Sequence, residues 1–151
     1  STAAGCQLVA QCDLAVAASE ARFGVNGIDV GLFCATPSVP LSRNMQPKQA
    51  MEMLVTGGFI DAAEAQRRGL VNRVVPAAQL DEEVQALLTA ILGKPRVALA
   101  MGKQLFYQQA EMGIAAAYQL AGQTMACNMM DDVAQEGVQA FIDKREPTWR
   151  S

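Results

Sequence analysis

The sequence predicts an α/β protein in which a small, incomplete sheet is followed by a long helical region. Residues 13–18 are apolar after the first position, as in strands that are buried on both faces. Almost every segment after Leu80 carries its apolar residues at helical spacing instead. The chain has 151 residues, of which 51% are apolar and 18% charged, which suits one folded core.

The first elements are short and are separated by turns rich in small residues. Small residues at the start of the chain lead into a short helix around Gln7, and residues 13–18 form the first strand. The loop at 23–27 contains two glycines and an asparagine, which tolerate positive φ. The next helix is predicted to be capped by Thr36, with Pro37 in its first turn.

Two further helices and a second strand follow. Pro47 starts a helix over residues 48–55 that ends at a pair of glycines. Its buried face is predicted to consist of Ala50, Met51, Leu54 and Val55. Asp61 is expected to cap the next helix, and Glu64 three residues later completes a capping box. Residues 70–75 then form a strand.

The remainder of the chain is predicted to be helical, with no linker between two domains. Helices are expected at about 81–92, 95–109, 111–129 and 132–144. We therefore divide the chain into a partial core, residues 1–80, and a helical region, residues 81–151. A sheet of so few strands cannot cover its own edges, so we expect upstream residues or a partner chain to complete it.

Composition excludes several classes of function. The chain has no histidine, which removes imidazole acid–base chemistry and the Ser-His-Asp triad. Its four cysteines, Cys6, Cys12, Cys34 and Cys127, form no metal-ligand spacing, so we expect no metal site and reduced, buried thiols in a cytoplasmic protein. A net charge of −3 without a basic cluster argues against nucleic acid, and no apolar run is long enough to suggest a membrane.

Several motifs occur in a fixed order along the whole chain. They are Ala3-Ala4-Gly5-Cys6-Gln7, Ala21-Arg22-Phe23-Gly24, Gly69-Leu70-Val71-Asn72 and, at the C-terminus, Glu136-Gly137, Lys144-Arg145 and Pro147-Thr148-Trp149. Together they resemble the crotonase (enoyl-CoA hydratase/isomerase) superfamily. The segment 31–34 is most similar to the branch of enoyl-CoA hydratase domain-containing proteins. The resemblance implies a spiral of ββα turns, with its N-terminal part missing, followed by helices that assemble trimers or hexamers.

The resemblance also implies a site for an acyl-CoA thioester. Members of the family hold the thioester oxygen with two backbone N–H groups while it becomes enolate-like. The motif places one donor at the N–H of Ala4, in the turn formed with Ala3 and Gly5; the other donor lies upstream of the matched motifs. Preorganised donors of this kind contribute roughly 3–4 kcal/mol each. Coenzyme A enters as part of the substrate, and no separate cofactor is expected.

Hydratases that this chain resembles carry two glutamates. One takes a proton from water, and the other handles the proton of the α-carbon. The corresponding positions here are Gln7 and Gly27, which do not titrate, so standard hydration is not expected. Gln7 either positions a water or acyl group or is a buried amide that satisfies nearby backbone. Asp29 is either a displaced carboxylate or a solvated capping residue.

The remaining candidates also have two interpretations each. Asn26 donates to a substrate carbonyl or simply forms a turn. Thr36 and Pro37 line the acyl pocket or only begin a helix. Lys144 matches a family position near the CoA nucleotide. Alternatively, it is only a basic residue at a helix end, where its charge interacts favourably with the helix dipole.

Three hypotheses of function remain open. The first is an acyl-CoA-binding protein of the crotonase superfamily with weak or altered catalysis. The second is a catalytically silent, truncated chain that supports oligomerisation. The third is a module that binds other proteins through faces that are normally covered.

Overall fold

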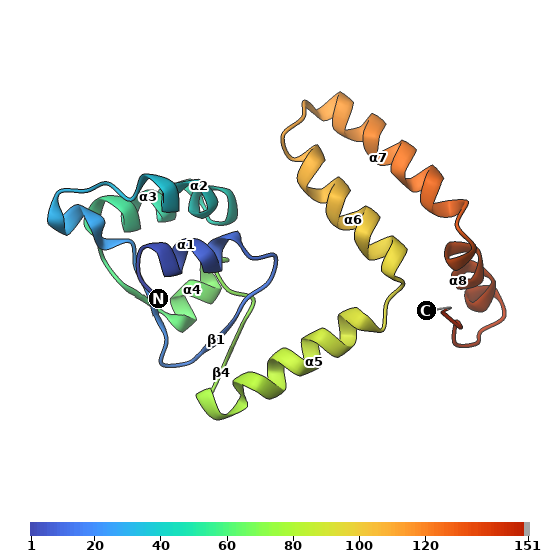
Figure 1. The fold of residues 1–151 in the computed structure, drawn as a ribbon, viewed down its shortest axis with the longest axis horizontal. Coiled ribbons are helices and arrows are strands. Elements are labelled where there is room, and N and C mark those ends of the chain that lie inside the picture. Colours follow the sequence, from blue (N-terminus) through green and yellow to red (C-terminus); the bar gives the residue numbers. More distant parts are fainter. Residues whose placement is uncertain (150–151) are drawn as a thin grey trace. The chain divides into compact units, whose positions relative to one another are not determined.

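A computed structural model of the chain describes residues 1–149. The chain divides into two compact units, Ser1–Ala86 and a second that begins at Leu87 (Figure 1). The division at residue 80 that we derived from the sequence separates a site-bearing core from a helical region. Compactness does not test which residues carry a site, so that division stays a prediction.

The first unit packs short helices around two small sheets (Figure 1). Its elements are α1 (Ala4–Gln11), β1 (Val16–Ala18), β2 (Arg22–Phe23), the 3-10 helix η1 (Asn26–Val30), α2 (Ala35–Asn44), α3 (Pro47–Thr56), β3 (Ile60–Asp61), α4 (Ala62–Arg67), β4 (Arg73–Val75), η2 (Ala77–Gln79) and the start of α5 (Leu80–Leu92). The parallel pair β1–β4 places Val16 opposite Arg73, and the antiparallel pair β2–β3 places Arg22 opposite Asp61. Both predicted strands exist, as β1 and β4, but are shorter than expected, and β2 and β3 were not predicted.

The core of this unit lies between its helices. The largest fully buried side chains are Leu41, Met53, Val25 and Cys6. On α3 the buried residues are Ala50, Met53 and Leu54, whereas Met51 and Val55 are 54% and 53% exposed. The predicted buried face of α3 was therefore correct for Ala50 and Leu54 but wrong for Met51 and Val55.

The helix starts confirm one predicted cap and correct another. Asp61 accepts a hydrogen bond of 2.8 Å from the Glu64 N–H, as predicted. The Glu64 carboxylate does not complete the capping box. It binds Arg67 and Arg68 instead, and these hydrogen bonds lower its pKa to about 2. The cap of α2 is Cys34 rather than Thr36, which lies inside the first turn with Pro37.

The cysteines differ in exposure more than the sequence suggested. All four are free thiols. Cys6 is buried, and burial raises the pKa of its thiol. Cys34 is half-buried, but Cys12 and Cys127 are exposed, so the prediction of four buried thiols was wrong for these two.

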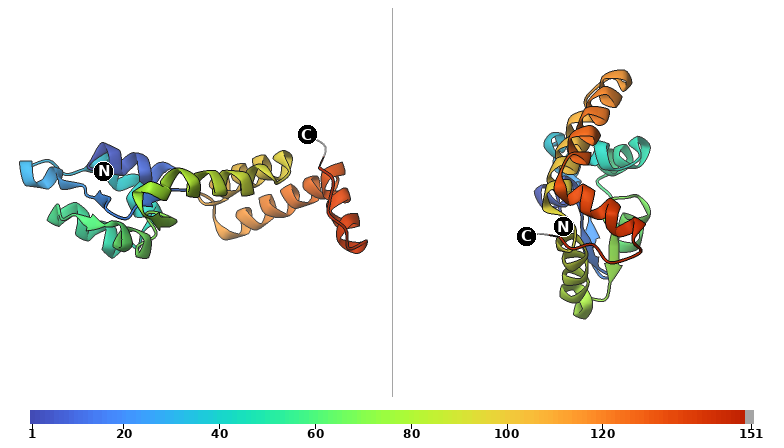
Figure 2. Two further views of the ribbon diagram at one scale, coloured as in Figure 1. Left: turned by 90° about the horizontal axis from the view of Figure 1, so that it is seen from below. Right: turned by 90° about the vertical axis from the view of Figure 1, so that its right-hand side faces the viewer.

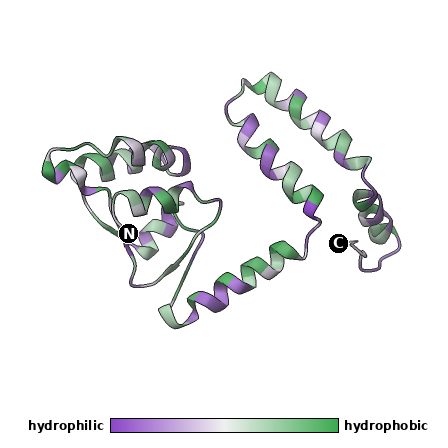
Figure 3. Ribbon diagram, viewed as in Figure 1, coloured by the Kyte–Doolittle hydropathy of each residue, from purple (hydrophilic) through white to green (hydrophobic). Residues whose placement is uncertain are grey.

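The second unit consists of the end of α5, α6 (Arg96–Gln109), α7 (Ile114–Met129) and α8 (Asp132–Ile142). Helices α6 and α7 lie side by side as a hairpin (Figures 1 and 2). Apolar residues recur along α5 and α7 (Figure 3). Many apolar residues of this unit are exposed, including Ile114 at 76%, Met130 at 78% and Phe141 at 85%. These four helices confirm the predicted ones, with ends shifted by a few residues.

None of the helices in the described residues is by itself long and apolar enough to cross a bilayer. One bent pair, Ala77–Leu92 with Arg96–Gln109, meets the test by length and composition only.

Candidate functional site: a strained turn at the start of α1

The residues before α1 form a type II′ turn. The N–H of Gly5 donates to the carbonyl of Thr2 at 2.8 Å, which closes the turn. Ala3 has φ 42° and ψ −108°, close to the values of about 60° and −120° for the first central position of such a turn. That position favours glycine, so alanine holds this conformation under strain.

The strained conformation of Ala3 decides where the next amide points. The φ and ψ angles of Ala3 set the orientation of the peptide between Ala3 and Ala4, which carries the Ala4 N–H. The N–H groups of Ala3 and Gly5 both donate within the chain, but that of Ala4 has no acceptor among residues 1–149. Ala4 is exposed and is the first residue of α1. The turn therefore presents a free donor at the positive end of a helix.

Strand β2 anchors this turn. The N–H of Ala3 donates to the carbonyl of Gly24 at 2.9 Å, and the N–H of Gly24 donates to the carbonyl of Ser1 at 3.1 Å. These bonds continue the pairing at Thr2 and Gly24. The conformation of Ala3 is thus held both by the hydrogen bond to Gly24 and by the turn in which Ala3 lies.

Gln7 lies one helical turn beyond Ala3. Its N–H donates to the Ala3 carbonyl at 2.9 Å, and its side chain is half-buried. Among the described residues the Gln7 amide has no hydrogen-bond partner. Both interpretations of Gln7 remain open, and in both the amide is unable to take a proton from water at neutral pH.

Gly27 lies in a place with no room for a side chain. Its N–H donates to the Cys34 sulfur at 3.3 Å, and its carbonyl accepts from the Leu32 N–H at 2.9 Å. A Cβ at this position would lie 2.7 Å from the Leu32 oxygen and 2.8 Å from the Cys34 Sγ. The loop is therefore closed around a glycine, and any carboxylate here would require the backbone to move.

Asn26 and Asp29 belong to the 3-10 helix η1. Asn26 is half-buried at its start, and the residue before it makes no side-chain cap. The exposed carboxylate of Asp29 lies over Gly57, whose Cβ would be 2.8 Å from Oδ1. Gly57 has φ 66° at the end of α3. Asp29 thus contacts the end of α3, and no contact joins it to the turn before α1 among the described residues.

The last three predicted residues divide between the two units. Thr36 is exposed and Pro37 is buried in the first turn of α2. Lys144 belongs to the second unit, whereas the other nine candidates lie in the first. It is exposed and has φ 55°, because it occupies the left-handed position of a Schellman motif in which the Arg145 N–H donates to the Ala140 carbonyl at 3.0 Å.

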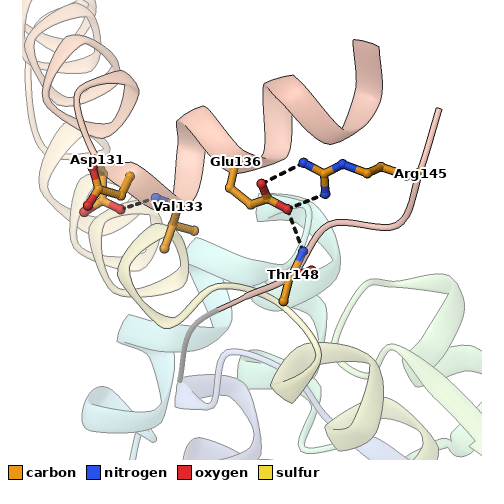
Figure 4. Close-up of a pocket in the computed structure, with 6 residues that line it drawn as sticks. Asp131, Val133, Glu136, Arg145 and Thr148 are labelled. Carbon is orange, nitrogen blue, oxygen red and sulfur yellow. Dashed lines mark hydrogen bonds and ion pairs between the residues drawn. The ribbon is translucent and has the colours of Figure 1, made fainter. Parts of the chain in front are cut away.

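An ion pair near Lys144 was not predicted from the sequence. Arg145 donates twice to Glu136, at 2.7 and 2.9 Å, and the Thr148 N–H donates to the same carboxylate at 2.8 Å (Figure 4). The bonds from Arg145, and then that from Thr148, lower the pKa of Glu136 to about 2. A hollow of about 750 Å³ beside them is also lined by Asp131, Asp132 and Val133. The sequence signal that could have revealed this ion pair is the presence of opposite charges, Glu136 within the last helix and Arg145 just after it.

No group of three side chains suited to holding a metal ion occurs in the described part of the chain. The first unit offers a backbone donor at Ala4, an amide at Gln7 and a glycine at position 27. The donor can polarise a carbonyl oxygen, while neither Gln7 nor Gly27 supplies a group that transfers protons at neutral pH.

Comparison with known proteins was made for the whole chain. The sequence model of the family described as enoyl-CoA hydratase/isomerase matches residues 1–151. The rat protein named enoyl-CoA hydratase domain-containing protein 3, mitochondrial, is 49% identical over 148 residues, which cover 98% of this chain and 49% of that protein. The human protein of the same name is 46% identical and covers 97% of this chain and 48% of its own length. The chain therefore spans about half the length of these relatives.

Solved structures give the same picture. The crystal structure of an enoyl-CoA hydratase from Mycobacterium smegmatis superposes with a TM-score of 0.96 at 61% identity, covering 99% of this chain and 58% of that one. The human domain-containing protein 3 superposes with a TM-score of 0.93 at 46% identity, covering 98% and 58%.

The relatives correct one prediction. We expected a cytoplasmic protein, but the rat, mouse and human relatives at 46–49% identity are all named as mitochondrial proteins. The reduced thiols on which the expectation rested do not distinguish these compartments, so this prediction was wrong.

Proposed function

Because the chain belongs to the enoyl-CoA hydratase/isomerase family, we propose that it contributes one half of an acyl-CoA-binding site, with the Ala4 N–H as a donor to the thioester oxygen. The fold is the predicted one, part of a crotonase spiral followed by helices. The observation that carries the proposal is the free N–H of Ala4, which projects from a turn that β2 and α1 hold in place.

Polarisation of a carbonyl is what this donor supplies. As an acyl thioester becomes enolate-like, negative charge grows on its oxygen, and a preorganised N–H stabilises that charge without having to reorient. The partial positive charge at the start of α1 acts in the same direction. A second backbone donor would complete the pair.

Standard hydration is not part of the proposal. Gln7 cannot serve as a general base, and the space beside Gly27 is filled by the Leu32 carbonyl and the Cys34 sulfur. Asp29 is directed at Gly57, which offers no support for a displaced catalytic carboxylate. We therefore propose an acyl-CoA-binding protein with weak or altered catalysis.

Binding of the CoA nucleotide is proposed for Lys144 rather than for Arg145. The guanidinium of Arg145 is occupied by Glu136 and Asp143, so it has little capacity left for a phosphate. Lys144 is exposed and makes no ion pair within residues 1–149. Asn26, Gly5, Thr36 and Pro37 remain proposed only as residues near the acyl group.

Assembly into a homo-oligomer, a trimer or hexamer, is proposed as well. Exposed apolar side chains on α7 and α8 support it, since soluble monomers rarely expose this many. The same observation favours the second candidate function, a chain that is catalytically silent and acts in oligomerisation.

Titration with a 2-enoyl-CoA thioester tests the proposal. We expect saturable binding by calorimetry and no decrease in the ultraviolet absorbance of the conjugated thioester over several hours. A defined oligomer that binds no thioester supports the silent alternative. Hydration at the rate of an ordinary hydratase contradicts our account of Gln7 and Gly27.

A further inference from the structure

We infer that Phe59 is a positioning residue for the Ala4 N–H, because its ring packs on Gly24 and holds the type II′ turn in the conformation that exposes this donor. The inference rests on the proposed function, since it concerns the donor assigned there to the thioester oxygen. Phe59 does not reach the substrate in this scheme. It acts through the backbone of β2.

The first step is the contact between Phe59 and Gly24. A Cβ on Gly24 would lie 2.9 Å from Cδ1 and Cε1 of the ring and 3.0 Å from Cγ. Real Cβ atoms do not approach ring atoms so closely, so the ring lies where only glycine leaves room. Gly24 is buried beneath it, although Phe59 itself remains 39% exposed.

The second step is the hydrogen bonding of Gly24. Its carbonyl accepts from the Ala3 N–H at 2.9 Å, and its N–H donates to the Ser1 carbonyl at 3.1 Å. The ring of Phe59 therefore packs against Gly24, while the carbonyl and the N–H of Gly24 form hydrogen bonds with Ala3 and Ser1. A displacement of Gly24 is therefore transmitted to Ala3 through the first bond and to Ser1 through the second.

The third step is the strain at Ala3. A non-glycine residue with φ 42° persists only where its surroundings hold it. If Gly24 moves, the backbone of Ala3 can relax to a negative φ, which relieves the strain and changes the direction of the Ala4 N–H. The ring of Phe59 is thus coupled to a donor with which it has no direct contact.

The ring has a brace of its own. The guanidinium carbon of Arg22 lies 5.6 Å from the centre of the Phe59 ring, within range of a cation–π interaction. The residues that follow Arg22 and Phe59 in the sequence, Phe23 and Ile60, are paired in the β2–β3 ladder. Arg22 and β3 therefore keep the ring over Gly24 even though it is partly exposed.

A double-mutant cycle tests the inference in the protein that carries residues 1–151. Gly24→Ala places a methyl group against the ring, and we expect about tenfold weaker acyl-CoA binding together with a shifted Ala4 amide resonance in NMR spectra. Phe59→Ala in the same background removes the obstruction, and we expect both the affinity and the resonance to return toward wild type. Phe59→Leu alone is a milder change that should shift the resonance without unfolding the protein.

The outcomes separate this inference from the proposed function. If the wild type binds acyl-CoA and Gly24→Ala lowers stability while leaving affinity and the Ala4 resonance unchanged, the role of Phe59 is only structural and the inference is overturned. If the wild type binds no acyl-CoA, the proposed function fails by itself. A resonance that moves in Gly24→Ala and returns in the double variant still supports the mechanical coupling in that case.

Discussion

The amide of Gly27 donates to the thiol of Cys34, and the two residues are so close that a Cβ at position 27 would lie 2.8 Å from the sulfur. The Leu32 carbonyl lies equally near on another side. Position 27 corresponds to a glutamate in hydratases of the family, and in this structure the surrounding loop leaves no space there for a side chain. Restoring the carboxylate by substitution alone would conflict with the loop that surrounds it.

Gly27→Ala is expected to lower the free energy of unfolding by about 1–3 kcal/mol, the usual cost of overpacking. Urea denaturation measures this. Gly102→Ala is a suitable control, because a Cβ there meets nothing within 4 Å and alanine favours the helix by about 1 kcal/mol. Equal stability of Gly27→Ala and wild type would show that the loop yields freely.

Ala3→Gly is expected to raise the free energy of unfolding by about 1 kcal/mol, because relief of the strained φ exceeds the added entropy of the unfolded chain. The Ala4 donor is retained, so thioester affinity should change little. Thermal unfolding provides the measurement, with Ala115→Gly in the first turn of α7 as the control that should destabilise. A loss of stability in Ala3→Gly would mean that the turn is not strained.

The Glu136–Arg145 pair predicts a pH dependence. The folded-state pKa of Glu136 is lowered from its ordinary 4.5 to about 2, so the carboxylate stabilises the fold above about pH 4.5 and loses that effect as the pH falls toward 2. Glu136→Gln should therefore have a lower Tm than wild type at pH 7. The two Tm values should converge between pH 4.5 and 2.

Glu146→Gln serves as the control for this series, since its side chain makes no ion pair within the described residues. It should follow the wild type at every pH. A difference between wild type and Glu136→Gln that stays constant down to pH 2 would contradict the role assigned to the ion pair.

Lys144→Gly is expected to stabilise the protein by about 1 kcal/mol, because glycine adopts the left-handed end of the Schellman motif without strain. Lys94→Gly, placed after α5 where φ is not positive, should bring no such gain. Denaturant midpoints compare the two. If both substitutions destabilise to the same extent, φ at Lys144 is not the cause.

Local signals in the sequence predicted most of the fold. The order of the helices and of the two predicted strands, and the Asp61 cap, depend on residues within a few positions of each other, and these predictions were confirmed. The cap of α2 was missed because threonine is a preferred capping residue and cysteine is not, yet α2 begins at Ala35 and Cys34 makes no side-chain cap. The exposure of Met51 depends on what packs against α3, which periodicity alone does not specify.

The site was predictable only where a motif marks it. The motif placed the donor at Ala4, and the structure adds a free N–H in a type II′ turn. The approach of Cys34 to Gly27 and of Phe59 to Gly24 joins residues 7 and 35 positions apart through the folded backbone. Sequence patterns contain no signal for such contacts, and the glycines themselves were readable only as turn residues.

Replacement of the Ala3–Ala4 amide by an ester tests the central claim most directly, because it deletes the Ala4 N–H and leaves the side chains unchanged. The control is the same replacement at Ala115, in the first turn of α7. We predict that the ester at Ala4 weakens binding of a 2-enoyl-CoA thioester by up to about tenfold, the effect of one hydrogen bond to a carbonyl oxygen, while the ester at Ala115 has no effect. Equal affinity of the two esters and the wild type would contradict the assignment of Ala4 to the thioester oxygen.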